Sequence, residues 1–141
     1  MLHIESLVFN SFQVNTYLVR HENGDCLVVD PAFYSPEEIH AFDSHISSEG
    51  LNIIGQINTH CHVDHVLGLG HMKTAYDCPL RAHPEESGLL GNAPLMGEVF
   101  GLKLEPLPGI DKPIADNELI EIGNDSLSAI LVPGHSPGSL S

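Results

Sequence analysis

The segment from Thr59 to His65 concentrates side chains that bind metal ions. It reads Thr-His-Cys-His-Val-Asp-His, which places the four metal-capable side chains at the spacing H-x-H-x-D-H. His60 and His62 are two residues apart, so in extended backbone they project to the same side. Asp64 and His65 follow where the chain is expected to turn, so they can aim at a neighbouring point. Neutral imidazoles and carboxylates are ligands that Zn²⁺ and Fe²⁺ accept.

The alternative interpretation of this segment is a polar loop enriched in histidine by chance, because the chain has 10 histidines in 141 residues. Chance would also have to supply the flanking motifs described below. The remaining isolated histidines are interpreted as surface or packing residues: His3, His21, His40, His45, His71 and His83. Alternation in the segment points Cys61 away from His60 and His62, which predicts a buried thiol that is not a ligand.

Composition narrows the class of protein. A length of 141 residues suits one domain, and the net charge of −14 argues against a nucleic-acid substrate, because phosphate binding needs a cationic surface. Three cysteines without a C-x-x-C pair predict free thiols in a reducing compartment. The N-terminus shows neither a signal peptide nor a membrane span, so a cytoplasmic protein without membrane association is expected.

Strands and helices are expected to alternate and then to end in paired strands, which predicts a mixed α/β layer structure. A helix begins at Ser35-Pro36-Glu37-Glu38, and a second is expected over residues 66–76, where Gly68 and Gly70 lower helix propensity. Residues 88–101 are expected to be a loop with at most one helical turn. Strands are expected over residues 3–9, 12–20, 26–29, 51–58, 78–83, 119–122 and 127–132. Asp30, at a strand end, could support the metal loop or form a turn.

Several motifs together resemble the metallo-β-lactamase superfamily, in its glyoxalase-II-like branch. The histidine segment resembles the family signature, and the other matching motifs are Asn15-Thr16-Tyr17-Leu18, Val28-Val29-Asp30-Pro31-Ala32 and Pro133-Gly134-His135-Ser136-Pro137-Gly138-Ser139. The resemblance implies an αββα sandwich, of which residues 1–141 would be the N-terminal part, one domain incomplete at its C-terminus. A bridging Asp and a last His of the family have no counterpart before Ser141.

The resemblance carries His60, His62 and His135 onto a first metal position, and Asp64 and His65 onto a second. Zn²⁺ is the expected metal, one or two ions per complete domain, with Fe²⁺ or Mn²⁺ as alternatives. The implied function is hydrolysis of a small thioester, such as a hydroxyacyl-glutathione, by a metal-bound hydroxide. Asp64 is the candidate catalytic residue, because it could also handle the proton.

Two other functions stay open at this point. Cys61 within the histidine segment also resembles the persulfide dioxygenase branch, which uses one Fe²⁺. A non-catalytic metal-binding protein on the same fold is the second alternative. The expected partner is a small-molecule substrate, and an unpaired sheet edge leaves self-association of the chain open. For residues 1–141 alone, at most one bound metal and little thioesterase activity are expected.

Overall fold

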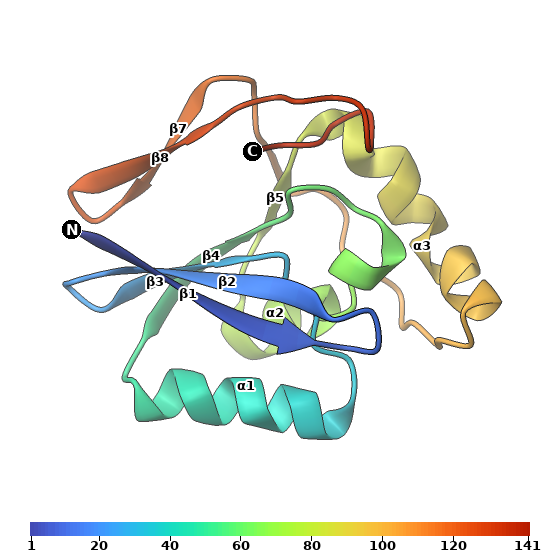
Figure 1. Ribbon diagram of the computed structural model, residues 1–141, viewed down its shortest axis with the longest axis horizontal. Helices are drawn as coiled ribbons and strands as arrows, with labels where there is room; N and C mark the ends of the chain where they lie inside the picture. The colour runs from blue at the N-terminus through green and yellow to red at the C-terminus, as the bar shows by residue number, and fades with distance from the viewer.

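The computed structural model describes residues 1–141, and its main sheet contains six strands in the order β1-β2-β3-β4-β5-β6 (Figure 1). The first three strands are antiparallel and joined by short turns, whereas β3 to β6 run parallel. Parallel neighbours need long crossover connections, which the helices supply. The strands are β1 (Leu2–Phe9), β2 (Val14–His21), β3 (Asp25–Val29), β4 (Asn52–Ile57), β5 (Leu80–Ala82) and β6 (Lys112–Pro113).

The first crossover helix, α1 (Pro36–Ser48), begins as its sequence predicts. The hydroxyl of Ser35 accepts a hydrogen bond from the backbone N–H of Glu38, and the Glu38 carboxylate accepts one from the backbone N–H of Ser35. This reciprocal cap satisfies two N–H groups that a helix start otherwise leaves free. Phe42 and Ile46 are the buried residues of α1 and anchor it to the sheet.

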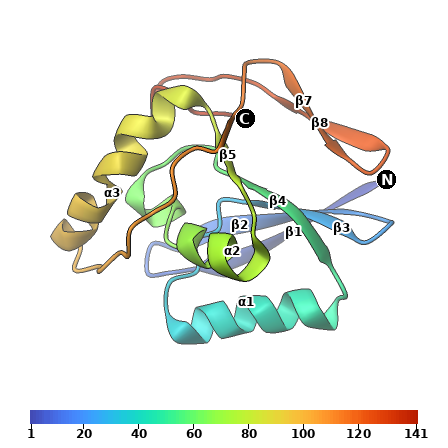
Figure 2. The ribbon, with the colours of Figure 1, turned by 180° about the vertical axis from the view of Figure 1, so that it is seen from behind.

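Two apolar cores lie on opposite faces of the main sheet. One face packs against α1 and α2 (Leu69–Tyr76), which lie on the same side of the sheet in both ribbon views (Figures 1 and 2). The other face packs against a hairpin, β7 (Glu118–Ile122) and β8 (Asp125–Ala129). This helix–sheet–sheet stacking matches the N-terminal part of the expected αββα sandwich. The hairpin's outer face leaves Leu119 64% exposed.

The structure corrects two of the expected elements. Residues 88–101 are not a loop, because α3 spans Ser87–Val99 and contains Pro94. Its Leu90 and Ala93 are buried in a third apolar cluster with residues of β5 and α2, so tertiary packing outweighs the low helix propensity of its glycines. The helix expected over residues 66–76 starts later, at Leu69, as α2, and a separate 3₁₀ turn, η1 (Val63–His65), precedes it. A further 3₁₀ turn, η2 (Pro84–Glu86), precedes α3.

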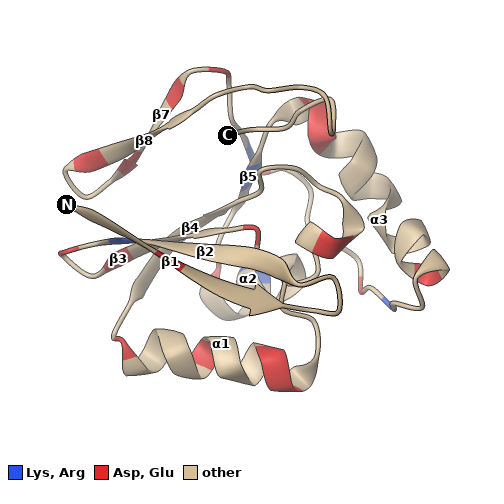
Figure 3. Cartoon of the chain, in the orientation of Figure 1, with Lys and Arg blue, Asp and Glu red and all other residues tan.

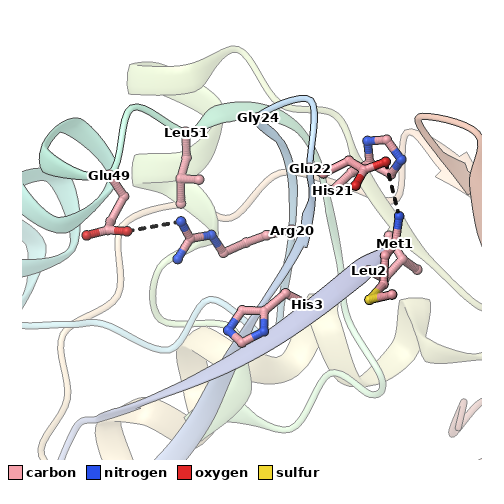
Figure 4. Close-up of a pocket in the computed structure, with 9 residues that line it drawn as sticks. All are labelled: Met1, Leu2, His3, Arg20, His21, Glu22, Gly24, Glu49 and Leu51. Atoms are coloured by element: carbon pink, nitrogen blue, oxygen red, sulfur yellow. Dashed lines mark hydrogen bonds and ion pairs between the residues drawn. The ribbon is translucent and has the colours of Figure 1, made fainter.

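Figure 4 shows the largest hollow of the molecule, about 620 Å³, whose lining contains no residue of the histidine segment. Gly24 and Leu51 line it, and they precede β3 and β4, so it lies at the amino ends of these parallel strands. Arg20 reaches across it to the carboxylate of Glu49 at 3.0 Å. The histidine segment follows β4 and therefore belongs to the opposite end of the sheet.

Acidic side chains are spread over α1, the β7–β8 hairpin and the start of α3, while the few Lys and Arg are scattered (Figure 3). The chain contains no helix that combines the length and the apolar character needed to cross a bilayer.

Candidate metal centre

Three loops meet at the carboxyl ends of the strands. Asp30 directly follows β3, and the histidine segment follows β4. The loop that carries His135 returns to the same place, because the backbone N–H of Leu140 donates to the carbonyl of Thr59 at 2.8 Å. Carboxyl ends of parallel strands are where ligand sites of α/β sheets occur. The sheet topology thus brings together residues that are more than 100 positions apart.

Three histidines converge in the first donor group. His60, His62 and His135 each offer a ring nitrogen, and these nitrogens lie within 4.8 Å of one another. Nδ1 of His62 is 3.1 Å from Nε2 of His135, and the ring centroids of His60 lie 5.0 and 4.8 Å from those of His62 and His135. Three imidazoles that face one point are a ligand set for Zn²⁺ or Fe²⁺.

His60 is held in the neutral form that a metal ligand requires. Burial, and then the neighbouring charge of His65, lower the pKa of His60 to about 4. Nδ1 of His60 lies 3.0 Å from the hydroxyl of Thr59, while its Nε2 is buried without any hydrogen-bond partner. A buried polar atom without a partner is unfavourable, and a bound ion at this nitrogen would remove the deficit.

Asp30 accepts hydrogen bonds from the histidine segment and lies where the chain bends after β3. One carboxylate oxygen accepts the backbone N–H of Thr59 at 2.7 Å, and the other accepts the Thr59 hydroxyl at 2.6 Å and lies 3.1 Å from Nδ1 of His65. Its φ of 50° is the left-handed conformation that Asp tolerates. Burial acts to lower the pKa of His65, but the hydrogen bond and charge of Asp30 outweigh it and raise that pKa. The expected support of the metal loop by Asp30 is therefore present, whereas its side chain makes no hydrogen bond within its own turn.

Asp30, His60 and His65 form a second group of three possible donors. Because both oxygens of Asp30 already accept hydrogen bonds, we interpret Asp30 as the residue that orients His65 rather than as a ligand. Nε2 of His65 then stays available on the far side of the ring. The carboxylate of Asp64 lies 3.5 Å from this nitrogen, but Asp64 belongs to neither three-donor group. Asp64 and His65 are thus paired beside the three converging histidines, because the ring centroid of His65 lies 4.1 Å from that of His60.

Cys61 points into the protein as its position in the segment predicts. It is fully buried in the cluster with Val66 and Leu90, and burial together with Glu86 raises the pKa of its thiol. A buried protonated thiol is a poor metal ligand. Cys26 and Cys78 are also buried and free.

Several supporting residues escape sequence reasoning. The side-chain amide of Asn58 donates to the carbonyl of His65 at 2.8 Å and to that of His60 at 3.2 Å, so it fixes the loop from inside. The side chain of Asn10 donates to the carbonyls of Asp64 and Ala32 at 3.0 and 2.9 Å. The buried carboxylate of Glu86 accepts hydrogen bonds from the histidine segment, at Cys61, and from the loop that carries His135, at Gly138. No sequence motif marks these residues. Asn10 and Glu86 contact groups that are far away in the chain, and Asn58 contacts two carbonyls of the segment that follows it.

A small apolar cavity of about 200 Å³ adjoins the histidine segment. His62 and Asp64 line it on one side, and α3 provides apolar residues on the other. The remaining lining residues are Cys61, Val63, Leu89, Ala93, Met96 and Phe100. The site therefore combines converging imidazoles with an adjacent apolar recess, as small-molecule sites commonly do.

Comparison with known proteins agrees with this geometry. The sequence model of the family described as "Metallo-beta-lactamase superfamily" matches residues 10–141. The "Probable metallo-hydrolase YqgX" of Bacillus subtilis is 32% identical over 131 residues, which are 92% of this chain and 59% of that protein. A "Hydroxyacylglutathione hydrolase" of Rhodospirillum rubrum is 32% identical over 125 residues, 88% of this chain and 40% of the relative.

A solved structure, described as "TTHA1623 in a di-iron-bound form", superposes with a TM-score of 0.80 at 27% identity. The alignment covers 96% of this chain and 64% of that one. The chain therefore spans between two fifths and two thirds of the length of these similar proteins.

Proposed function

Because the chain belongs to the metallo-β-lactamase superfamily, we propose that its three converging histidines hold a metal ion in a hydrolase of small thioesters. The observation that carries this proposal is the donor set of His60, His62 and His135, with Nε2 of His60 buried and unpartnered. The naming of similar proteins as a metallo-hydrolase and as hydroxyacylglutathione hydrolases supports the reaction class.

Each residue of the site has a role in this proposal. His60, His62 and His135 hold the first ion, and Asp64 with His65 provides a second position. A bound ion of this kind lowers the pKa of water to about 7 and polarises a carbonyl. Asp30 fixes the ring of His65, and Thr59 fixes Nδ1 of His60, so Nε2 of each ring is left free for an ion. We assign Asp64 the proton-handling role, because it is a carboxylic acid that lines the apolar cavity beside His62.

Zn²⁺ is our proposed metal, and Fe²⁺ is the principal alternative, since three imidazoles suit both. The di-iron form of the similar structure at 27% identity supports iron as a serious candidate. Elemental analysis of the full-length protein, purified without chelators or added metal, decides between them. Zinc at one or two equivalents supports our choice, and iron at those values replaces it.

The reaction is tested with the full-length gene product, because residues 1–141 span only part of similar proteins. The metal-loaded protein is incubated anaerobically with S-lactoylglutathione, and thiol release is followed. We expect hydrolysis that does not need oxygen and that falls by at least about a hundredfold in His62→Ala. The matched control is His40→Ala, whose imidazole is exposed on α1 away from the site. Absence of thiol release, with oxygen uptake on a glutathione persulfide instead, would contradict the proposal.

A further inference from the structure

Glu86 is a buried acid that joins the two loops carrying the histidines. Its side chain has no solvent exposure. One carboxylate oxygen accepts the backbone N–H of Cys61 at 2.7 Å. The other accepts the backbone N–H of Gly138 and the hydroxyl of Ser136, each at 2.7 Å. The residues that donate are therefore the one between His60 and His62 and two that follow His135.

The arrangement is specific to a carboxylate. A buried charge is unfavourable unless hydrogen bonds satisfy it, and here three short bonds do so without any cation among the partners. Glu86 packs closely against the loop that carries His135, because a Cβ built on Gly138 would lie 3.0 Å from a carboxylate oxygen of Glu86. The loop that carries His135 thus approaches Glu86 through its backbone, and a side chain at position 138 would be crowded against Glu86 and His83.

We propose that Glu86 is a positioning residue, which sets the separation of the two histidine loops and thereby the affinity of the metal site. Without its carboxylate, the backbone N–H groups of Cys61 and Gly138 would be buried without partners and would seek water or new contacts. His62 and His135, which stand 3.1 Å apart, would then lose their fixed spacing. This inference rests on the proposed function only in requiring that an ion binds at the three histidines.

The test compares Glu86→Gln with Glu85→Gln, whose side chain is the exposed neighbour in η2. In Glu86→Gln an amide N–H faces one of the buried donors, so one loop loses its acceptor. Affinity for Zn²⁺ is measured by competition with a chromophoric chelator, and Co²⁺-loaded protein gives the d–d absorption spectrum. We expect metal affinity about 10–100-fold weaker and an altered Co²⁺ spectrum in Glu86→Gln, with neither change in the control.

An unchanged affinity and Co²⁺ spectrum in Glu86→Gln would overturn the inference, even if its melting temperature fell. Should Glu86→Gln fail to fold, Ser136→Ala removes only one of the three donors and serves as the second variant. It is expected to weaken metal binding by a few-fold and to shift the same spectrum, and wild-type values there would equally overturn the inference. Failure of the wild-type protein to bind Zn²⁺ or Co²⁺ would reject the metal site itself.

A different observation, the apolar cavity between the histidine segment and α3, leads to a second inference. The cavity is about 200 Å³ and opens beside His62 and Asp64. It is smaller than the pockets of about 300–1,000 Å³ that hold drug-sized ligands, so it suits one apolar group rather than a whole substrate. We infer that it receives a short acyl chain of the substrate, an inference that rests on the proposed thioester hydrolysis.

The test measures kcat/KM of the full-length protein on acetyl-, butyryl- and hexanoyl-glutathione. We expect an increase of at least about tenfold from the shortest to a longer chain. Ala93→Leu, which places a larger side chain at the cavity wall, should abolish this increase. Leu95→Phe is the control, because Leu95 is exposed on α3 outside the cavity, and the profile should stay as in the wild type. Hydrolysis at equal rates for all chains rejects this subsite alone, whereas no hydrolysis of any thioester rejects the proposed function and the subsite with it.

Discussion

Nδ1 of His62 and Nε2 of His135 lie 3.1 Å apart, although 73 positions separate the two residues in the chain. Two neutral imidazoles at this distance can share one proton, or both can donate lone pairs to one ion. His60 favours the binding of an ion, because its Nε2 is buried, has no hydrogen-bond partner and lies close to the nitrogens of the other two histidines. The contact therefore defines the point at which a metal is expected.

Replacing His60 or His62 with Ala should remove the metal from the first position, because each variant lacks one of three converging donors. Metal content per chain, measured by elemental analysis after gel filtration, is expected to fall by about one equivalent. Cys61→Ser changes a residue of the same loop whose side chain is buried away from the donors, so it should retain its metal. Loss of metal in Cys61→Ser, or full occupancy in the histidine variants, would contradict the ligand assignment.

Asp30→Asn should weaken metal binding without removing any proposed ligand. The amide can still accept from Thr59, but it can no longer hold the ring of His65 as a carboxylate does. Loss of such orienting partners typically costs 10- to 100-fold in affinity, and we expect a reduction of about that size. Chelator competition measures it, and Asp43→Asn, which changes an acid paired with His71 on another face, is the control. Equal affinities in the two variants would show that Asp30 serves the turn alone.

Gly68 and Gly70 should respond in opposite ways to the same substitution. A Cβ on Gly68 would lie 2.7 Å from both the Pro31 carbonyl oxygen and a ring carbon of Phe33, so Gly68→Ala is expected to destabilise the fold by about 1–3 kcal/mol. A Cβ on Gly70 meets nothing within 4 Å in the first turn of α2. Gly70→Ala should therefore stabilise the protein by about 0.5–1 kcal/mol through helix propensity.

Urea unfolding of metal-free protein measures both glycine variants. Equal changes in the free energy of unfolding for the two variants would show that the contacts around Gly68 do not exclude a larger side chain there.

Glu118 should make stability depend on acidic pH. The backbone N–H of Ala115, and then the guanidinium of Arg81, lower the pKa of Glu118 from its ordinary value of 4.5 despite partial burial. A carboxyl whose folded-state pKa is depressed stabilises the protein above its unfolded pKa, and this contribution is lost as pH falls through the folded pKa. Glu118→Gln should therefore cost about 0.5–1 kcal/mol at pH 7, and the difference should vanish well below pH 4.5.

The control for this experiment is Glu121→Gln, an exposed position on the same strand. Its difference from the wild type should be small and should not follow pH in this way. A cost for Glu118→Gln that persists unchanged at low pH would assign it to packing instead of charge.

Local chemistry explains why much of this protein could be predicted from its sequence. The start of α1 follows from Ser35 and Glu38, whose capping interactions involve neighbours in the chain. The donors His60 and His62 share a side because they are two residues apart in extended backbone, and Cys61 between them is buried as alternation predicts. Capping and side-chain alternation each depend on residues that are close together in the chain, so they can be predicted from the sequence.

Only the tertiary structure decided the features that depend on contacts between distant segments. α3 forms because Leu90 and Ala93 find an apolar cluster, although its own glycines and Pro94 oppose a helix. The meeting of His62 with His135 depends on how the second loop returns to Thr59, and the burial of Glu86 beneath both loops depends on the same return. Every residue except proline has a backbone N–H group, so hydrogen bonds to these groups cannot be predicted from residue type. The sequence therefore indicated which side chains could bind a metal, and the fold decided which residues hold them in place.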